Sequence, residues 1–261
     1  MKNNFFNLKN KIVFIIGGSG FLGQDIAQAF LDFESKVINL DIKNNIKNSK
    51  KINYYKFDST DLKNLKKNIL KIINKNGIPD VVINASYPHS KNWANSNFTN
   101  IQLSNYEKNI KLHLNSFVWS AKIFADIMKA NKKEGSIILL NSIYGIIAQD
   151  QKNYKNTNMK ENLTYSVIKG GITNFVRQMA SYYGQFKIRV NTICLGGIKG
   201  HVQSISSKQS KIFIRQYVSK TPLGRMGESK DTIGAIILLS TDKSSYITGT
   251  NLIIDGGYTI V

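Results

Sequence analysis

Short apolar runs and amphipathic segments alternate along the chain from its beginning. Residues 11–16 are apolar from Ile12 onward and are followed by glycines, which predicts a buried strand and a turn. Residues 21–33 carry apolar side chains at nearly helical spacing, and residues 36–40 are again short and β-branched. A strand, a helix and a second strand within about 30 residues are typical of a βαβ unit.

The same alternation continues to the carboxyl end. Helices are predicted over residues 61–76, 105–131, 164–183 and 230–239, and strands over residues 81–84, 136–140, 187–194 and 251–254. Because these strands show little polar alternation, we expect both of their faces to be buried. Two polar stretches, residues 90–100 and 149–162, are predicted to be loops. The pattern predicts an α/β fold with a single doubly wound, Rossmann-type parallel sheet, helices on both faces and one domain over residues 1–261.

Composition narrows the class of protein. The chain has 261 residues, of which 42% are hydrophobic, so it can bury a sizeable core. No apolar run reaches the roughly 18 residues that cross a bilayer, and we predict no membrane association. A single cysteine, Cys194, excludes a disulfide within the chain and favours a reducing, cytoplasmic compartment. No metal site is predicted.

The net charge of +20 has two interpretations. One is attraction to an anionic partner such as nucleic acid or a membrane surface. However, the lysines are scattered along the chain together with many asparagines, and no long basic block occurs. We therefore interpret the charge as a compositional bias and predict no nucleic-acid partner, while a general attraction for anionic metabolites stays open.

A glycine-rich turn separates the first predicted strand from the first helix. It has the form GxGxxG, preceded by one more glycine, and comprises Gly17, Gly18, Ser19, Gly20, Phe21, Leu22 and Gly23. Such a turn lets the backbone approach a pyrophosphate, and the following helix presents free N–H groups to it. The motif alone is weak, but its place between a strand and a helix is what dinucleotide binding requires.

The second strand ends at Asp41. A carboxylate there can accept hydrogen bonds from the adenosine ribose hydroxyls, and it repels a 2′-phosphate. Lys43 lies nearby and weakens this argument. The predicted cofactor is therefore NAD, with NADP as the alternative.

Tyr165 and Lys169 lie one turn apart within a predicted helix. Two similar pairs begin at Tyr87 and Tyr183, but a proline follows the first tyrosine and a glycine the second, so neither pair fits inside a helix. Lowering a tyrosine pKa from about 10 to about 7 takes about 4 kcal/mol. A positive charge about 4 Å away supplies that order of energy. With the oxidised nicotinamide, Lys169 would thus let a phenolate take the proton of an alcohol as hydride leaves.

Ser142 follows the strand predicted over residues 136–140. The carboxyl ends of parallel strands form the ligand crevice of open sheets. A hydroxyl there can donate to the substrate oxygen and stabilise negative charge on it. The alternative is a serine that caps the next turn.

These motifs together make the chain resemble the short-chain dehydrogenase/reductase family over nearly its full length. The resemblance also covers Phe57-Asp58-Ser59, Asn84-Ala85-Ser86, Arg189-Val190-Asn191 and the segments 247–249 and 255–257. It implies that Ser142, Tyr165 and Lys169 are catalytic. It further implies that Asp58, Ser59, Asn84, Ala85, Ser86, Lys169, Gly196 and Ile198 bind the cofactor.

Some positions depart from the family pattern. Ile16 stands where a threonine is usual, Ser86 replaces a glycine and Leu195 replaces a proline. The family's catalytic asparagine aligns with His113, whereas Asn115 lies two residues further on. His113 is either a proton relay of its own or a packed helix histidine, and both interpretations stay open.

The loop 149–162 is longer than the family usually has at this place. Because it is polar and close to Tyr165, we predict a substrate loop there, and a lid region over residues 198–228. This loop, the segment Leu112-His113-Leu114 and the segment Ser142-Ile143-Tyr144-Gly145 resemble the flagellin modification protein A branch, which is associated with sugar biosynthesis for surface glycans. The resemblance implies an NAD(P)-dependent oxidoreductase that acts on a polar or anionic small molecule, a sugar phosphate or nucleotide sugar, as a homodimer or homotetramer. The alternatives are a 3-oxoacyl thioester reductase and a non-catalytic NAD-binding module.

Overall fold

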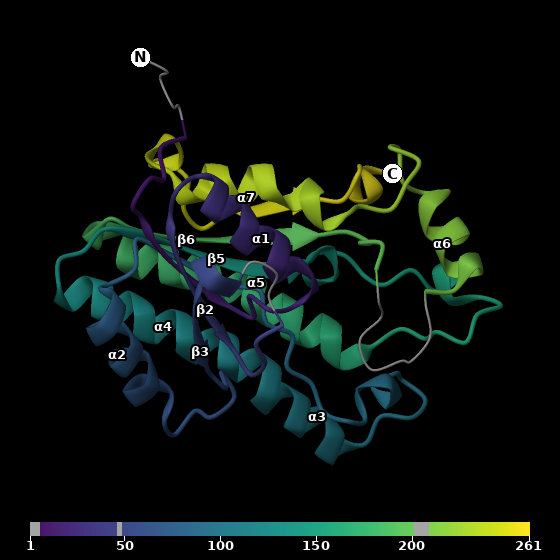
Figure 1. Cartoon of the computed structure of the whole chain (residues 1–261). Helices are drawn as coiled ribbons and strands as arrows, with labels where there is room; N and C mark the ends of the chain where they lie inside the picture. The colour runs from purple at the N-terminus through teal and green to yellow at the C-terminus, as the bar shows by residue number, and fades with distance from the viewer. Residues whose placement is uncertain (1–5, 46–48, 201–208) are drawn as a thin grey trace.

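The computed structural model describes residues 6–45, 49–200 and 209–261. They are built on a seven-stranded parallel sheet with the order β3-β2-β1-β4-β5-β6-β7 (Figure 1). The strands are β1 (Ile12–Ile16), β2 (Lys36–Asp41), β3 (Asn53–Lys56), β4 (Val81–Asn84), β5 (Gly135–Ser142), β6 (Ile188–Leu195) and β7 (Asn251–Ile254). The α-helices are α1 (Phe21–Asp32), α2 (Leu65–Asn76), α3 (Leu103–Asn109), α4 (Asn115–Ala130), α5 (Leu163–Tyr183), α6 (Lys211–Val218) and α7 (Ile233–Ser240). The predicted doubly wound α/β fold is confirmed.

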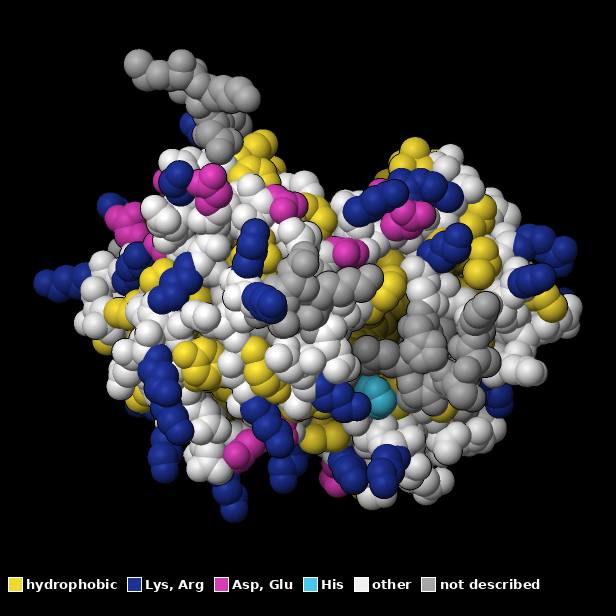
Figure 2. Space-filling model, in the orientation of Figure 1, with side chains coloured by type: hydrophobic (Ala, Val, Ile, Leu, Met, Phe, Trp, Pro, Cys, Tyr) yellow, Lys and Arg dark blue, Asp and Glu magenta, His cyan; other side chains and the backbone are white. Residues whose placement is uncertain are grey.

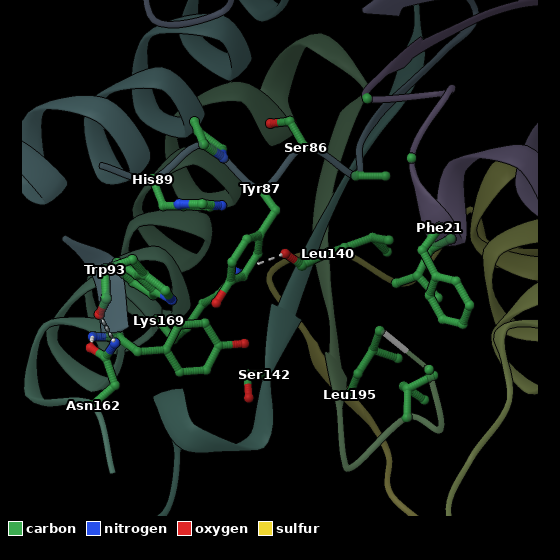
Figure 3. A pocket seen from close by; sticks show the side chains of 18 of the residues that line it. Phe21, Ser86, Tyr87, His89, Trp93, Leu140, Ser142, Asn162, Lys169 and Leu195 are labelled. Carbon is green, nitrogen blue, oxygen red and sulfur yellow. Dashed lines mark hydrogen bonds between the residues drawn. The ribbon is translucent and has the colours of Figure 1, made fainter. Parts of the chain in front are cut away.

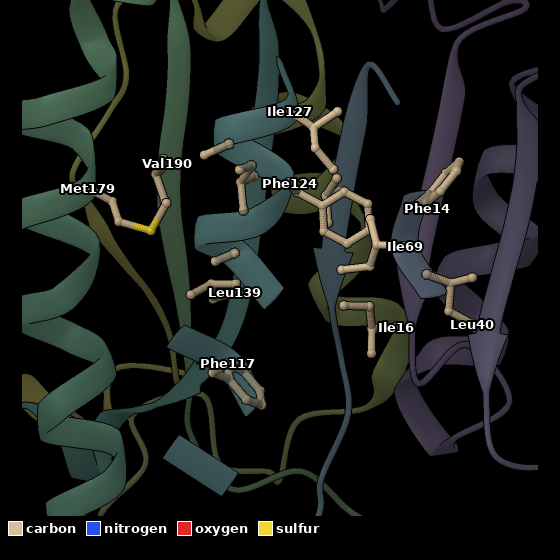
Figure 4. Packing of buried hydrophobic residues seen from close by; sticks show 14 of the residues in the cluster. Phe14, Ile16, Leu40, Ile69, Phe117, Phe124, Ile127, Leu139, Met179 and Val190 are labelled. Atoms are coloured by element: carbon tan, nitrogen blue, oxygen red, sulfur yellow. The ribbon is translucent and has the colours of Figure 1, made fainter. Parts of the chain in front are cut away.

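Helices cover both faces of the sheet because successive residues of a strand point to opposite sides. Phe14 of β1 belongs to the buried cluster that includes side chains of α2, α4 and α5, and its ring lies edge-on to Phe124 with centroids 5.7 Å apart (Figure 4). Val13 and Ile15 face the opposite cluster, which includes side chains of α1 and α7. Figure 1 shows α1 and α7 above the sheet and α2 and α4 below it. Burial on both sides explains why the strands lack polar alternation.

Most predicted elements agree with the structure to within a few residues, but β3 and α6 were missed. β3 is an edge strand that pairs only with β2 among the described residues, and its sequence Asn-Tyr-Tyr-Lys has no fully buried position. A half-exposed edge strand needs no apolar run, so the pattern that identified the central strands is lacking there. α6 is a short helix within the predicted lid region, of which residues 201–208 lie outside the described part of the chain.

The long helix predicted over residues 105–131 is one uninterrupted run of helical residues, but it is not α-helical throughout. α3 is followed by a π-helical turn, Ile110–Leu114, and then by α4. A π turn is wider than an α turn and changes which side chains face the same side before and after it. In this turn the side chain of His113 is completely buried.

The carboxyl ends of the parallel strands all lie along the same edge of the sheet. The order of the strands reverses direction between the neighbouring strands β1 and β4. Ligands of open parallel sheets bind at such a switch point. In Figure 2 the surface is hollowed near the centre of the view, while Lys and Arg side chains are spread over the visible face rather than gathered in one patch. Within the described part of the chain, no helix is long and apolar enough to cross a membrane.

Candidate active site

A cavity of about 1210 Å³ runs along the carboxyl edge of the sheet. The segments that follow β1, β2, β4, β5 and β6 all contribute to its wall. Pockets for one small molecule typically measure about 300–1,000 Å³, so this cavity has room for a dinucleotide and a second ligand.

The glycine turn forms one end of this wall. Gly17 has a φ of +81°, and a Cβ there would lie 2.7 Å from the backbone of Ser86, so the segment after β4 packs directly against the turn. Gly18 and Gly23 lie behind the wall, where a side chain on either would overlap neighbouring atoms. The residues of the turn that line the cavity are Gly17, Ser19, Gly20, Phe21 and Leu22. α1 begins at Phe21, so its first N–H groups lie beside the cavity, as dinucleotide binding requires.

Asp41 lies at the end of β2 in the same wall. Its Oδ2 accepts a hydrogen bond of 2.9 Å from the N–H of Ser19, and its Oδ1 accepts one of 3.2 Å from the backbone N–H of Lys43. The buried amide of Asn39 donates to Oγ of Ser19 at 2.8 Å. The carboxylate is therefore held next to the glycine turn, a placement that fits a ribose diol.

The other predicted cofactor residues divide into lining and supporting positions. Asn84 is buried behind the wall, where its Oδ1 accepts hydrogen bonds from the N–H and the hydroxyl of Ser86 at 3.1 and 2.6 Å. It therefore positions Ser86 instead of facing the cavity. The positions that line the cavity are Asp58, Ser59, Ala85, Ser86, Gly196 and Ile198.

Ser142, Tyr165 and Lys169 all line this cavity. Figure 3 shows Ser142 and Lys169 there. The Ser142 hydroxyl hydrogen-bonds the Tyr165 phenol, which lowers the pKa of that phenol. Lys169 Nζ lies 5.4 Å from the centroid of the Tyr165 ring and donates to the Leu140 carbonyl at 3.4 Å. Ser142 also accepts from the N–H of Tyr144 at 3.2 Å, so it caps the next turn as well as facing the tyrosine. The capping interpretation of Ser142 is confirmed, and the role of the same hydroxyl in binding the substrate oxygen stays a prediction.

The protein's own residues do not lower the Tyr165 pKa as predicted. Burial raises the pKa of Tyr165 to about 12, because it disfavours the phenolate more than the Ser142 hydrogen bond favours it. Burial also lowers the pKa of Lys169 to about 7, so its amine carries only part of its charge at neutral pH. The prediction relied in addition on the positive charge of oxidised nicotinamide, which acts in the same direction as the Ser142 hydrogen bond.

Contacts between β5 and α5 fix the spacing of the serine and the lysine. The side-chain amide of Asn141 donates to the carbonyl of Lys169 at 3.2 Å and to Oγ1 of Thr173 at 2.9 Å. A Cβ at Gly145 would lie 2.5 Å from the same Lys169 carbonyl, so the turn after β5 touches the helix backbone. α5 thereby presents Tyr165 and Lys169 to Ser142 in a fixed register.

His113 lies behind the active residues in a cluster of aromatic rings. Its ring centroid is 5.1 Å from that of Tyr87 and 5.2 Å from that of Phe117. Neither ring nitrogen makes a hydrogen bond of ordinary geometry within the described residues, although a contact with the Pro88 backbone slightly favours the charged form. Burial, and then the charge of Lys169, hold the pKa of His113 well below its usual value. Neither His113 nor Asn115 lines the cavity. The packed interpretation is favoured, and the proton relay stays a prediction.

Beyond Tyr165 the cavity continues into a wall that the sequence analysis did not assign. We call it the amide and aromatic wall, because aromatic rings and side-chain amides dominate it. From the segment after β4 it includes Tyr87, His89, Trp93, Asn95, Asn97 and Asn100, with Tyr144 from the turn after β5. The available signal was the position of residues 85–100 after a central strand, which places them at the ligand edge of the sheet.

The predicted substrate loop and lid region reach the same cavity. The loop contributes Gln149, Tyr154, Asn158, Met159, Lys160, Glu161 and Asn162. The described part of the lid region contributes Ile198, Gly200, Gln209, Phe213, Tyr217 and Met226. Both segments therefore lie where a substrate next to Tyr165 would contact them.

The glycine turn beside Asp41, with a tyrosine, lysine and serine further along the same cavity, defines a dinucleotide-binding oxidoreductase. A family model described as enoyl-(acyl carrier protein) reductase matches residues 20–259. The chain belongs to the short-chain dehydrogenase/reductase family, as its motifs predicted, and is an NAD(P)-dependent oxidoreductase.

Relatives cover nearly the whole chain. It is 30% identical to post-translational flagellin modification protein A of Campylobacter coli, over 96% of this chain and 99% of the relative. It is 26% identical to the NADH-dependent L-xylulose reductase of Ambrosiozyma monospora, over 97% of each. A short-chain dehydrogenase of Leptospira borgpetersenii, solved with bound NAD+, is 32% identical and superposes with a TM-score of 0.87 over 99% of this chain and 97% of that one.

Proposed function

We propose that the protein transfers a hydride between NAD and a hydroxyl or carbonyl carbon of a polyhydroxylated small molecule, a sugar phosphate or nucleotide sugar used for surface glycans. The observation that carries this proposal is the amide and aromatic wall beyond Tyr165. Side-chain amides both donate and accept hydrogen bonds, and aromatic rings offer flat apolar faces, so together they suit a ligand rich in hydroxyls. The name of one relative, the NADH-dependent L-xylulose reductase, supports a sugar-like substrate.

The same wall argues against a 3-oxoacyl thioester. A buried polar group left without a partner costs about 1–3 kcal/mol. An acyl chain next to Tyr165 would place methylene groups against amides of this wall such as Asn95 and Asn100, whose side chains make no described hydrogen bond. The presence of Ser142, Tyr165 and Lys169 in one cavity argues against a non-catalytic NAD-binding module.

Asp41 supports NAD over NADP. Its carboxylate would accept hydrogen bonds from the adenosine ribose and repel a 2′-phosphate. Of Lys43, the backbone N–H rather than the ammonium group makes the described contact with that carboxylate. The glycine turn would hold the pyrophosphate, and Asp58 and Ser59 would lie near the adenine. When bound, NAD supplies the nicotinamide carbon that accepts or gives the hydride.

The remaining chemistry is a proton transfer by this chain's own residues. Ser142 would donate a hydrogen bond to the substrate oxygen, and the Tyr165 hydroxyl would give a proton to that oxygen or take one from it. Because burial keeps Tyr165 neutral at pH 7, the free protein holds it ready as a proton donor, the role needed for carbonyl reduction. Alcohol oxidation needs the pKa of Tyr165 to fall when the ternary complex forms.

The test is a turnover assay with NAD and a panel of sugars, sugar phosphates and sugar nucleotides, followed at the absorbance band of reduced nicotinamide. Tyr165→Phe should lower kcat by at least about a thousandfold, near the upper end of what acid–base catalysis contributes, and leave the Kd for NAD nearly unchanged. Tyr182→Phe removes a hydroxyl from an exposed tyrosine of the same helix and serves as the control. Turnover of 3-oxoacyl thioesters but of no hydroxylated compound, or full activity of Tyr165→Phe, would refute the proposal.

A further inference from the structure

One side chain joins the two ends of the substrate loop 149–162. The Nε2 group of Gln149 donates to the Asn162 carbonyl at 2.8 Å, and Gln149 Oε1 accepts from the Asn162 N–H at 3.0 Å. The same amide also reaches out of the pair, donating to Oγ of Ser166 at 2.8 Å and accepting from the Tyr154 hydroxyl at 3.0 Å. The first and last residues of the loop are thus held together by two hydrogen bonds between the Gln149 side chain and the Asn162 backbone.

The hydrogen-bonding capacity of this amide is fully used. A glutamine side chain offers two N–H donors and two acceptor positions on its oxygen, and these contacts occupy all of them. Its orientation is unambiguous, because the Asn162 carbonyl can only accept and the Asn162 N–H can only donate. Gln149 lines the cavity, but no donor or acceptor is left with which it could bind a substrate hydroxyl.

The residue that Gln149 holds is the one that begins the catalytic helix. Asn162 is the N-cap of α5, and its Oδ1 accepts from the backbone N–H of Tyr165 at 2.8 Å. Its Nδ2 donates to the carbonyl of Trp93 at 3.2 Å, shown as a dashed line in Figure 3. Asn162 therefore connects the substrate loop, the amide and aromatic wall and the first turn of α5.

We propose that Gln149 is a positioning residue: it closes the substrate loop and, through Asn162, places Tyr165 and the Trp93 segment for substrate binding. This inference rests on the proposed function. Among the described residues, the hydrogen bonds of Gln149 go to Asn162, Ser166 and Tyr154, and none goes to Asp41 or the glycine turn at the cofactor end of the cavity.

The test compares Gln149→Met, which keeps the length of the side chain and removes every hydrogen bond, with Gln149→Glu, which keeps the acceptors. Gln151→Met changes an exposed glutamine of the same loop and is the matched control. We expect Gln149→Met to raise the substrate KM by about tenfold, the factor that corresponds to one net hydrogen bond of ordinary strength. Gln149→Glu turns the donor to the Asn162 carbonyl into an acceptor facing an acceptor, so it should raise the KM at least as much. The Kd for NAD should stay within about twofold in both variants, a change smaller than the free energy of one such bond.

Amide hydrogen exchange gives a second readout that needs no substrate. The Asn162 N–H should exchange faster in Gln149→Met than in the wild type, and not in Gln151→Met. An unchanged KM with unchanged exchange, or an equal loss of NAD and substrate affinity, would overturn the proposal. If the wild type turns over no hydroxylated compound, the proposed function fails, and the exchange rates alone decide whether Gln149 closes the loop.

Discussion

Lys169 carries an amine into the interior, where its side chain is 2% exposed. Burial lowers the pKa of this amine, and the Cys194 thiol raises it by less. The spacing of Tyr165 and Lys169 was predicted from the sequence because a helix puts residues one turn apart on the same face. The burial of Tyr165 and Lys169 could not be predicted from the sequence, because it depends on the turn at Gly145 and on Asn141, which bring β5 against α5.

The pKa of Lys169 predicts how stability depends on pH. The folded pKa is about 7 and the unfolded value is about 10.5, so between these limits the unfolded chain binds a proton that the folded protein does not. Stability must then rise with pH from about 7 to about 10, by at most about 1.4 kcal/mol per pH unit. Urea denaturation of the wild type and of Lys169→Met over this interval isolates the effect.

The stability advantage of Lys169→Met over the wild type should be greatest at pH 7 and shrink as the pH rises. The exposed residue Lys71 supplies the control, because Lys71→Met should keep a constant difference from the wild type. A difference between Lys169→Met and the wild type that is independent of pH would show that the amine titrates in the folded protein as it does in water.

At the scale of elements, the sequence pattern identified strands with an apolar run, including β7 at one edge of the sheet, and missed β3, which has none. Central strands such as β4 are buried throughout, and the bounds of β4 were predicted correctly, whereas β3 at the sheet edge has no fully buried residue. The amide and aromatic wall was missed for another reason. Its residues Trp93 and Tyr144 follow different strands and are far apart in the sequence, and only the fold brings them to one cavity.

The N-cap of α5 gives a prediction at this scale. Asn162→Ala removes both the acceptor for the Tyr165 N–H and the donor to the Trp93 carbonyl, so it should cost about 1–2 kcal/mol of stability. Asn162→Asp keeps an acceptor for the cap and loses the donor. We expect it to be nearly as stable as the wild type in thermal denaturation but to have a raised substrate KM. Equal stability losses in the two variants would mean that the cap contributes nothing specific.

At the scale of the whole molecule, the net charge acts over a longer distance than any hydrogen bond or packing contact. The chain carries a net charge of +20, and its basic side chains are spread over the face seen in Figure 2. A distributed positive charge attracts any anion, without specifying one, and raises the rate of encounter at low salt. It therefore adds to the proposed function only if the substrate is anionic, as a sugar phosphate or nucleotide sugar would be.

Ionic strength separates this contribution from the contacts inside the cavity. Raising the salt from about 20 to about 200 mM shortens the Debye length from roughly 20 Å to below 10 Å and should lower kcat/KM for an anionic substrate several-fold. With NAD kept saturating, kcat/KM for an uncharged polyol should stay nearly constant, because the neutral amides and rings that would bind it do not depend on screening. The same steady-state assay measures both substrates. An equal response of the two would mean that the net charge plays no part in substrate capture, and would leave its compositional origin as the sufficient explanation.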